Sequence, residues 1–243
     1  MKKLFLWFFS FLALSAEGNY ALDKAQSLYQ EGNRYFAEKN YIEAIQKYHM
    51  ALEIAPSAEV HFNLGSAYQQ LNKPGYAFYN YIVAHQYKPL NTHYAKTLKS
   101  LKETFPQLPN YEESFYQKIW YCFHVNTWTI LLFIFFWGGC LFFLMFLFQK
   151  EKKYYLKVAI QSFFCAGIVV LLWALNYNST NKAILVQRQD LRLAPTEKSP
   201  TKKTIPEGTL CLVKQQQGNF FYVDIEGIDD GWIEQDYLMK LKR

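Results

Sequence analysis

Apolar positions follow three different patterns along this chain of 243 residues. From residue 25 to residue 105 they recur with the spacing of amphipathic helices. Two runs without a charged residue come next, over residues 128–148 and 158–175. Beyond Asn181 the apolar residues stand in short alternating stretches separated by Gly, Pro and polar turns. This order predicts a helical region, then helices that cross a membrane, then a small all-β domain.

The helical region contains a repeat of 33 residues. Residues 25–57 and 58–90 place the same residue types at matching positions, at Gly32 and Gly65, Ala44 and Ala77, Tyr48 and Tyr81, and Pro56 and Pro89. Small residues let the two helices of a repeat cross closely, and each proline ends a second helix because it lacks a backbone donor. Residues 92–105 continue the helical pattern and are predicted to cap the array.

These matching positions resemble the tetratricopeptide repeat. The resemblance implies an all-α solenoid over residues 21–105, made of two repeats and a capping helix, whose concave face binds an extended peptide. By that resemblance the concave face is lined by Gln26, Tyr29, Asn33, Phe36, Glu59, Phe62, Asn63, Ser66, Gln69 and Gln70. Asn33 and Asn63 stand where peptide-clamping members carry carboxylate-binding asparagines, although Tyr29 replaces the expected lysine. The alternative is that two repeats are too few for a deep groove and serve only for packing.

The two uncharged runs are long enough to cross a bilayer. At about 1.5 Å per residue, a helix over residues 126–148 covers the roughly 30 Å of a hydrocarbon core, and interfacial aromatic residues extend a second helix over residues 158–177. Residues 149–157 form a short basic loop, with lysines at 150, 152, 153 and 157, and such loops stay in the cytoplasm. We therefore expect a transmembrane hairpin with both flanking domains outside the cytoplasm.

Small residues lie near the middle of both predicted spans. Gly138 and Gly139 are in the first span, and Cys165, Ala166 and Gly167 are in the second. Close approach drives helix association in lipid, so we expect the two clusters to meet.

Residues 1–16 have the layout of a secretory signal peptide: Lys2 and Lys3, a short apolar core, then Ser15 and Ala16. Leu14 stands where a small residue would be preferred for cleavage, so the segment is either removed or kept as an extra anchor. Both outcomes predict extracytoplasmic repeats. Residues 106–125 are interpreted as a juxtamembrane linker, or as an amphipathic stretch at the membrane surface.

The last part of the chain has strand character. Strands are predicted at residues 183–187, 209–214 and 220–225, and residues 231–233 follow a predicted turn at Asp229 and Asp230. A small antiparallel barrel over residues 182–243 is the natural arrangement of so few short strands. The order of its motifs resembles the bacterial SH3-like domain, at residues 191–193 with Pro195, 205–208, 231–233 and Leu238.

Few residues indicate catalysis. The five histidines show neither an HExxH pattern nor a CxxC partner, and no GxSxG elbow or phosphate-binding glycine loop occurs. The carboxylates near the end are interpreted as solvated turns. The alternatives are calcium binding or a hydrolase that uses Asp229 and Asp230. The net charge of +6 reflects loop lysines and basic chain ends, so no nucleic-acid partner is predicted. We expect no enzyme, no cofactor and no metal.

The order of parts resembles the BatE-type members of the bacterial Bat aerotolerance family. The resemblance implies a multidomain protein of the bacterial inner membrane, with a tetratricopeptide-repeat solenoid and an SH3-like barrel on the periplasmic side of a two-helix hairpin. It also implies a scaffold for an envelope complex with membrane-bound von Willebrand-type Bat proteins and a MoxR-type ATPase, in envelope stress or oxygen tolerance. The alternative is a cell-wall sensor whose barrel binds peptidoglycan while its repeats recruit a protein.

Overall fold

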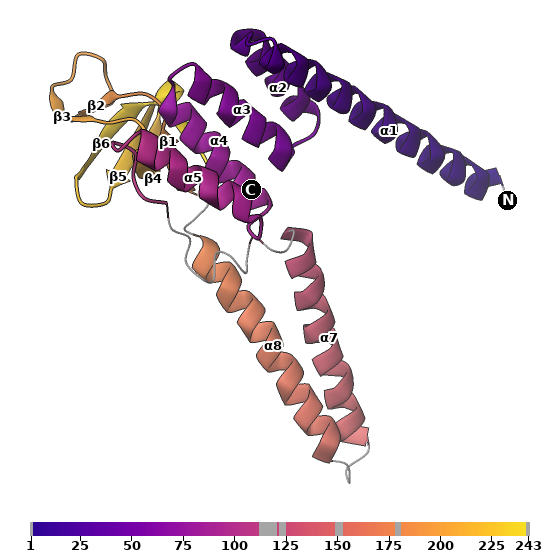
Figure 1. Ribbon diagram of the computed structural model, residues 1–243. Coiled ribbons are helices and arrows are strands. Elements are labelled where there is room, and N and C mark those ends of the chain that lie inside the picture. The colour runs from indigo at the N-terminus through magenta and orange to yellow at the C-terminus, as the bar shows by residue number, and fades with distance from the viewer. Residues whose placement is uncertain (1, 112–120, 122–124, 149–152, 178–180, 242–243) are drawn as a thin grey trace. The chain divides into compact units, whose positions relative to one another are not determined.

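The computed structural model describes residues 2–111, 121, 125–148, 153–177 and 181–241 (Figure 1). The chain divides into two compact units. The first combines Met1–Tyr111 with Ala183–Leu241, and we call it the repeat–sheet unit. The second, the hairpin unit, comprises Glu112–Lys182 with Lys242–Arg243. The helical repeats and the strands thus belong to one unit, and the hairpin is inserted between its two halves.

Helices make up the first half of the repeat–sheet unit. They are α1 (Lys2–Ala37), α2 (Tyr41–Ile54), α3 (Ala58–Gln70), α4 (Pro74–Tyr87) and α5 (Thr92–Thr104). The sequence-based prediction of two helix pairs followed by a further helix is confirmed. Helix α1 runs without a break from the segment predicted as a signal peptide into the first repeat. The signal peptide itself stays a prediction.

A glycine and a tyrosine set the crossing of each helix pair. A Cβ atom on Gly32 would lie 2.5 Å from Cε1 of Tyr48, and one on Gly65 would lie 2.8 Å from Cδ1 of Tyr81. Both tyrosine rings are buried. Each ring occupies the space that a side chain on the glycine would need. The two helices of each pair therefore cross closely at this glycine and tyrosine, in the first repeat and again in the second.

The turn within each pair also repeats. Lys39 (φ 61°) and Asn72 (φ 55°), each two residues after the last residue of a helix, both adopt the left-handed conformation. The amide of Asn40 donates to the carbonyl of Tyr35 over 2.9 Å, and that of Lys73 donates to Tyr68 over 3.0 Å. These bonds define a Schellman motif, which satisfies the last carbonyls of α1 and α3.

Seven strands form one antiparallel sheet. They are β1 (Lys182–Leu185), β2 (Gln189–Arg192), β3 (Thr201–Ile205), β4 (Leu210–Gln217), β5 (Phe220–Ile225), β6 (Asp229–Glu234) and β7 (Leu238–Lys240). Their order is β3-β2-β6-β5-β4-β1-β7. The core of the sheet domain includes Leu185, Leu191, Phe221, Val223 and Ile233.

The predicted barrel is wrong, because the sheet does not close. Barrel closure requires the two edge strands to pair at a fixed stagger. Here the edges are the short strands β3 and β7. The β7 edge lies against α4 instead, where the Tyr79 hydroxyl donates to the backbone carbonyl of Lys240 over 3.2 Å. Covering by a helix protects this edge without closure.

The predicted turn at Asp229 and Asp230 is also wrong. Both residues belong to β6, where Asp230 pairs with Asp224 of β5. The turn lies earlier, at Gly227, whose φ of 75° favours glycine. The strands expected around residues 183–187, 209–214, 220–225 and 231–233 correspond to β1, β4, β5 and β6.

Helix α4 joins the repeats to the sheet. Eleven of its fourteen residues are buried. One hydrophobic core contains Phe78 and Ile82 of α4 together with Leu108, Ile184 and Leu241. A Cβ atom on Gly75 would lie 2.4 Å from the carbonyl oxygen of Val186, so only glycine allows the sheet backbone this close.

Polar contacts extend the same interface. The backbone amide of Gly75, in the first turn of α4, donates to Oε2 of Glu207 over 3.3 Å. The amide group of Gln187 donates to the Tyr76 hydroxyl over 3.2 Å. A carboxylate at a helix N-terminus complements the helix dipole, so Glu207 caps α4 across 132 residues of sequence.

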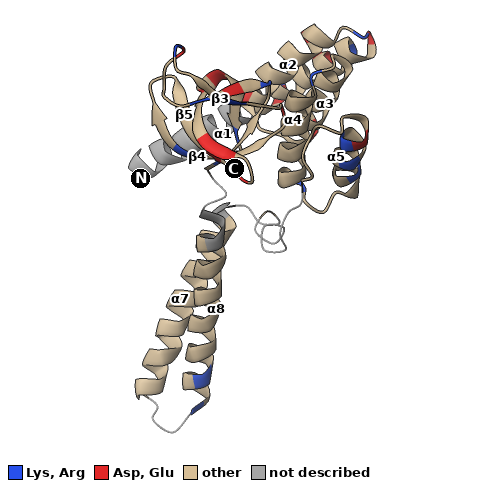
Figure 2. Cartoon of the chain, turned by 90° about the vertical axis from the view of Figure 1, so that its left-hand side faces the viewer, with Lys and Arg blue, Asp and Glu red and all other residues tan. Residues whose placement is uncertain are grey.

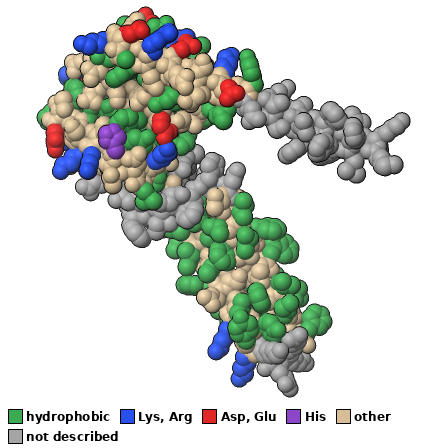
Figure 3. Space-filling model, turned by 45° about the vertical axis from the view of Figure 1, so that its right-hand side comes forward, with side chains coloured by type: hydrophobic (Ala, Val, Ile, Leu, Met, Phe, Trp, Pro, Cys, Tyr) green, Lys and Arg blue, Asp and Glu red, His purple; other side chains and the backbone are tan. Residues whose placement is uncertain are grey.

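The hairpin unit contains α7 (Val125–Phe148) and α8 (Lys153–Tyr177). Both are long and apolar enough to cross a membrane, by length and composition. Apolar side chains cover most of their visible surface (Figure 3). Lys153 and Lys157, near the start of α8, are exposed, and Figure 2 shows basic residues at the loop end of this helix.

The contact within the hairpin differs from the one expected. A Cβ atom on Gly139 would lie 3.1 Å from the Phe163 ring, and the hydroxyl of Ser162 donates to the carbonyl of Phe135 over 2.7 Å. Gly167 has no atom within 4 Å of its Cβ position. The glycines of α7 therefore meet Ser162 and Phe163, not the cluster around Gly167.

Candidate functional site

Helices α1 and α3 present the residues that sequence analysis assigned to a concave binding face. Four polar side chains form its centre. The Tyr48 hydroxyl donates to Oδ1 of Asn33 over 2.8 Å, and Nδ2 of Asn63 lies 2.8 Å from the same oxygen and 3.0 Å from the Tyr29 hydroxyl. Burial, and secondarily the nearby Tyr29, raises the pKa of Tyr48 to about 12, so its hydroxyl stays protonated.

The hydrogen bonds in this cluster bear on the predicted role of Asn33 and Asn63 as carboxylate-binding residues. The amide of Asn63 holds Asn33 and Tyr29 across the gap between α3 and α1. A ligand carboxylate would have to replace these bonds. The arrangement favours a structural role that fixes the position of the Tyr29 ring.

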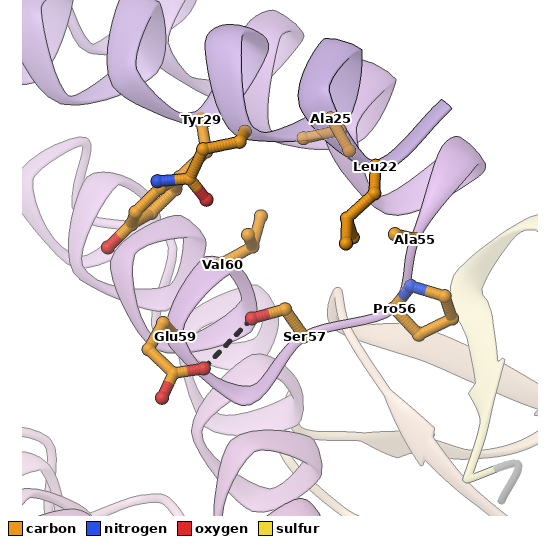
Figure 4. Close-up of a pocket in the computed structure, with 10 residues that line it drawn as sticks. Leu22, Ala25, Tyr29, Ala55, Pro56, Ser57, Glu59 and Val60 are labelled. Carbon is orange, nitrogen blue, oxygen red and sulfur yellow. Dashed lines mark hydrogen bonds between the residues drawn. The ribbon is translucent and has the colours of Figure 1, made fainter. Parts of the chain in front are cut away.

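A pocket of about 340 Å³ opens beside this cluster (Figure 4). Its wall is mostly apolar and comes from α1, the end of α2, the following turn and the start of α3. The lining residues are Leu22, Ala25, Gln26, Tyr29, Ala51, Ala55, Pro56, Ser57, Glu59 and Val60. Figure 4 shows Leu22 and Val60 reaching into the space between α1 and the turn.

Glu59 lies at the polar rim of the pocket. Its carboxylate accepts a hydrogen bond from the Ser57 hydroxyl over 2.9 Å and forms an ion pair with Lys88. Burial opposes the charge of Glu59, but the hydrogen bonds from Lys88 and Ser57 outweigh it and hold its pKa below the usual value. The rim is therefore charged but internally neutralised.

Aromatic rings fill the other half of the face. Phe62 lies between Tyr81, His93 and Tyr94, at ring-centroid distances of 5.2, 5.0 and 4.9 Å. The Tyr81 hydroxyl lies 3.1 Å from Oγ of Ser66 and 2.8 Å from Oε1 of Gln69. Burial raises the pKa of Tyr81. This half presents a packed aromatic surface.

The ten predicted residues thus separate into groups. Gln26, Tyr29 and Glu59 line the pocket. Asn33 and Asn63 bind one another, while Phe36 packs edge-on against Tyr41 at 5.4 Å and Gln70 is exposed. Their assignment to peptide binding stays a prediction.

Sequence reasoning missed the apolar part of the pocket. Ala25, Ala51 and Ala55 make room for it, and Pro56 and Val60 complete the wall. The prediction considered only positions on the first helix of each repeat. The small alanines near the end of α2 were the available signal, because small residues create the space that a pocket needs.

The carboxylates of β6 are bound within the fold. Nζ of Lys202 lies 2.7 Å from Oδ1 of Asp229 and 3.4 Å from Oδ1 of Asp230, and the Tyr222 hydroxyl donates to Asp230 over 2.5 Å. The hydrogen bond from Lys202 lowers the pKa of Asp229, and the one from Tyr222 lowers that of Asp230. Neither group is tuned to act as a general acid near neutral pH.

No group of three or more His, Cys, Asp or Glu side chains could hold a metal ion among the residues that the structure describes. Cys211 is buried in the sheet core, and burial raises the pKa of its thiol to about 12. A thiol with so high a pKa is a poor nucleophile.

Comparison with known families finds a TPR match in part of the helical region. A family model of the TPR repeat matches residues 32–72, from the end of α1 through α2 and α3. No curated protein matches the chain. Repeats of this type stack into surfaces that bind other proteins, so the match indicates a protein–protein interaction role.

Proposed function

We propose that this chain is a non-catalytic, membrane-anchored adaptor that binds an extended segment of a partner protein on the concave face of its repeats. The observation that carries the proposal is the pocket of about 340 Å³ between α1 and α3. Binding pockets of proteins are typically apolar with a few fixed polar groups. Here alanines, Leu22 and Val60 supply the apolar wall, and Gln26, Ser57 and Glu59 supply polar groups at the rim.

Anchoring rests on the two apolar helices and on the shared core of the repeat–sheet unit. Because the repeats and the sheet pack together, the chain between Tyr111 and Ala183 must return to the side of a membrane from which it left. Two crossings, by α7 and α8, satisfy this requirement. Lys153 and Lys157 at the loop end of α8 favour a cytoplasmic loop and an extracytoplasmic repeat–sheet unit.

The finer assignment follows the resemblance to the Bat family. In this proposal the protein lies in a bacterial inner membrane, its sheet is a diverged relative of SH3-like domains, and its partners are membrane-bound von Willebrand-type Bat proteins. The compact repeat–sheet unit presents the pocket and the outer face of the sheet together. An adaptor of this kind raises the effective concentration of two partners at one place.

Site-specific photocrosslinking in intact cells tests the adaptor function. A photoreactive phenylalanine analogue at the exposed, pocket-lining Gln26 is expected to capture a partner protein. The matched control carries the analogue at the exposed Gln46 of α2, which lies outside the pocket lining. Capture of the same proteins from both positions, or of none from Gln26, would contradict the proposal.

Cell-wall binding by the sheet is a second candidate. Tyr222 and Trp232 are cross-strand partners on β5 and β6, with ring centroids 5.1 Å apart, and both are partly exposed. Partly exposed aromatic pairs of this kind are common in binding surfaces. Sedimentation of the full chain with purified peptidoglycan, and its loss in a Trp232→Ala variant that remains folded, would support this function. Unchanged sedimentation of the variant would exclude this face.

A further inference from the structure

We infer that the pocket of the first repeat accepts an aromatic side chain of the partner. This inference rests on the proposed function, since it gives the chemistry of the partner segment bound there. It follows from a comparison of the pocket with the same place in the second repeat. There the chain fills the site with its own tyrosine.

The 33-residue register relates the two places. Ala25 and Ala51 of the first repeat correspond to Ala58 and Ala84 of the second, and Tyr29 corresponds to Phe62. Ala25, Ala51 and Tyr29 line the pocket. Their counterparts Ala58 and Ala84 are buried and belong to a cluster against which Phe62 packs. The same three positions therefore surround an open space in one repeat and a filled one in the other.

The side chain that fills the second site is Tyr94 of α5. It is the third buried member of the cluster with Ala58 and Ala84, and only 5% of it is exposed. Its ring stacks on Phe62 at a centroid distance of 4.9 Å and an interplanar angle of 25°. One aromatic ring is thus the group that completes this site in the folded chain.

The first site has a smaller residue in this position, supplied by α3 as Tyr94 is supplied by α5. Helix α5 (Thr92–Thr104) follows α3 (Ala58–Gln70) at the same length and an offset of 34 residues, so Tyr94 corresponds to Val60. Val60 lines the pocket but has no ring to fill it. The exchange of a ring for an isopropyl group leaves the space open.

The two sites also differ in the residues at their rims. In the second repeat, Lys88 pairs with Glu59 at the edge of the filled site. The corresponding residues of the first repeat are Ala55 and Gln26, which form no ion pair. The first site therefore lacks the ring that fills the second, and the ion pair at its own rim is formed on the α3 side, by Glu59 with Lys88.

A stacking surface for an incoming ring is already in place. Tyr29 lies against Tyr48 at 6.1 Å and 43°, and its counterpart Phe62 lies against Tyr81 at 5.2 Å and 44°. The hydrogen bond from Asn63 fixes Tyr29 further. An apolar cavity of about 150 Å³ holds benzene. The pocket of about 340 Å³ has room for a ring and part of its backbone.

Selection from random short peptides displayed on phage, against the full chain in lipid nanodiscs, tests the inference. We expect selected peptides to share a Tyr, Phe or Trp at one position. Replacement of that residue by Leu should weaken binding at least about tenfold, the effect of losing a buried anchor. Fluorescence anisotropy with labelled peptides measures the dissociation constants.

Two variants of the protein test the location. Val60→Tyr should place a ring in the pocket, as Tyr94 does in the second repeat, and weaken binding at least about tenfold. The matched control Val60→Ile, which adds one methylene without a ring, should change binding less than about threefold. Gln26→Glu combined with Ala55→Lys should also weaken binding, because it places a charged pair on two pocket-lining residues. It leaves Val60 unchanged, so it remains informative if Val60→Tyr misfolds.

The outcomes separate the inference from the proposed function. Selected peptides that bind with Leu or Ile in place of a ring, or that tolerate both pocket variants, would overturn the aromatic anchor and leave the adaptor in place if Gln26 still captures a partner. Failure to select any binding peptide, together with no capture from Gln26, would overturn both.

Discussion

The second helices of the two repeats share a register but differ in their surroundings. Helix α2 buries three residues, Ala44, Tyr48 and Ala51, whereas α4 buries eleven. Ile42 of α2 is 59% exposed at the position where Gly75 of α4 touches the sheet backbone. The repeat pattern thus determines the face that each helix turns to its partner. Whether the opposite face of the helix is buried depends on the part of the chain that packs against it.

The same difference appears at the helix N-termini. Helix α2 carries its own acidic residue, Glu43, in the first turn. Helix α4 has no acidic residue there and receives the carboxylate of Glu207 from the sheet half of the unit. The covered repeat depends on the sheet for electrostatic stabilisation as well as for burial.

The largest expected effect comes from Phe78. Its ring is buried in the core that α4 shares with the sheet, and its counterpart in α2 is the half-buried Ile45. Phe78→Ala should lower the free energy of unfolding by about 3–5 kcal/mol, and Ile45→Ala by about 1–2 kcal/mol. Hydrogen exchange of the β1 amides in the full chain measures the first effect locally. Equal losses in the two variants would contradict the comparison.

Gly75 provides the next largest effect. Glycine to alanine on an uncovered helix normally stabilises by up to about 1 kcal/mol. In Gly75→Ala the new Cβ would meet the carbonyl of Val186, so we expect a loss of about 1–3 kcal/mol. Ile42→Ala, at the same position of α2, should change stability by less than about 0.5 kcal/mol. Denaturant unfolding of both variants shows whether Gly75→Ala lowers the free energy of unfolding, as expected here, or raises it.

A smaller effect is expected from pH. Burial is the main cause that lowers the pKa of His49 and of His61. The unfolded chain then takes up protons near pH 6.5 that the folded chain does not, so stability is complete above about pH 6.5 and falls below it. The midpoint of thermal unfolding should drop between about pH 7.5 and pH 5.5. His61→Asn, which keeps a donor for Oδ1 of Asn80, should reduce this slope, and an unchanged slope would assign it to other groups.

The cap from Glu207 should have a modest effect. Glu207→Gln keeps the shape of the side chain but removes the charge near the α4 N-terminus, with an expected loss of about 0.5–1 kcal/mol that shrinks at high salt. The control is Glu234→Gln on the sheet, for which no shift beyond about 0.5 kcal/mol is expected. Thermal unfolding at low and high salt measures both. A salt-independent loss would point to a lost contact, not to the charge.

The smallest effect should be stabilising. Lys39 and Asn72 occupy the same left-handed turn position, which disfavours lysine by about 1 kcal/mol but is tolerated by asparagine. Lys39→Gly should therefore raise the stability of the first repeat by about 0.5 kcal/mol, and Asn72→Gly should change it little. Equal responses of the two variants in hydrogen exchange of α2 and α4 would remove this distinction between the turns.

The helical part of the fold was predictable because its determinants are local. Gly32 and Tyr48 recur as Gly65 and Tyr81, and each pair fixes one crossing. Strands β2 and β3 were not predicted as strands, because four of the five residues of β3 are exposed and show no alternation. Asp229 and Asp230 suggested a turn, but Lys202 neutralises them within the sheet.

Two features depend on contacts between distant segments: the burial of α4 by the sheet, and the pocket of the first repeat. The absence of Asp, Glu, Lys and Arg from α4 was a usable signal, since a helix apolar on all sides is buried on all sides. A repeat pattern does not predict that Val186 lies against Gly75, or that Val60 is too small to fill the pocket. Such features follow from side-chain volumes brought together by the whole fold.

The division of the repeat–sheet unit has a consequence for biosynthesis. The ribosome completes α4 well before it reaches the sheet that covers it, and the hairpin must be made in between. At roughly 5–20 residues per second, the interval from Tyr87 to Leu241 lasts about 10–30 s. During that time the side of α4 that the sheet later covers is exposed. Chaperones of the compartment into which the repeats emerge would find their binding surface there.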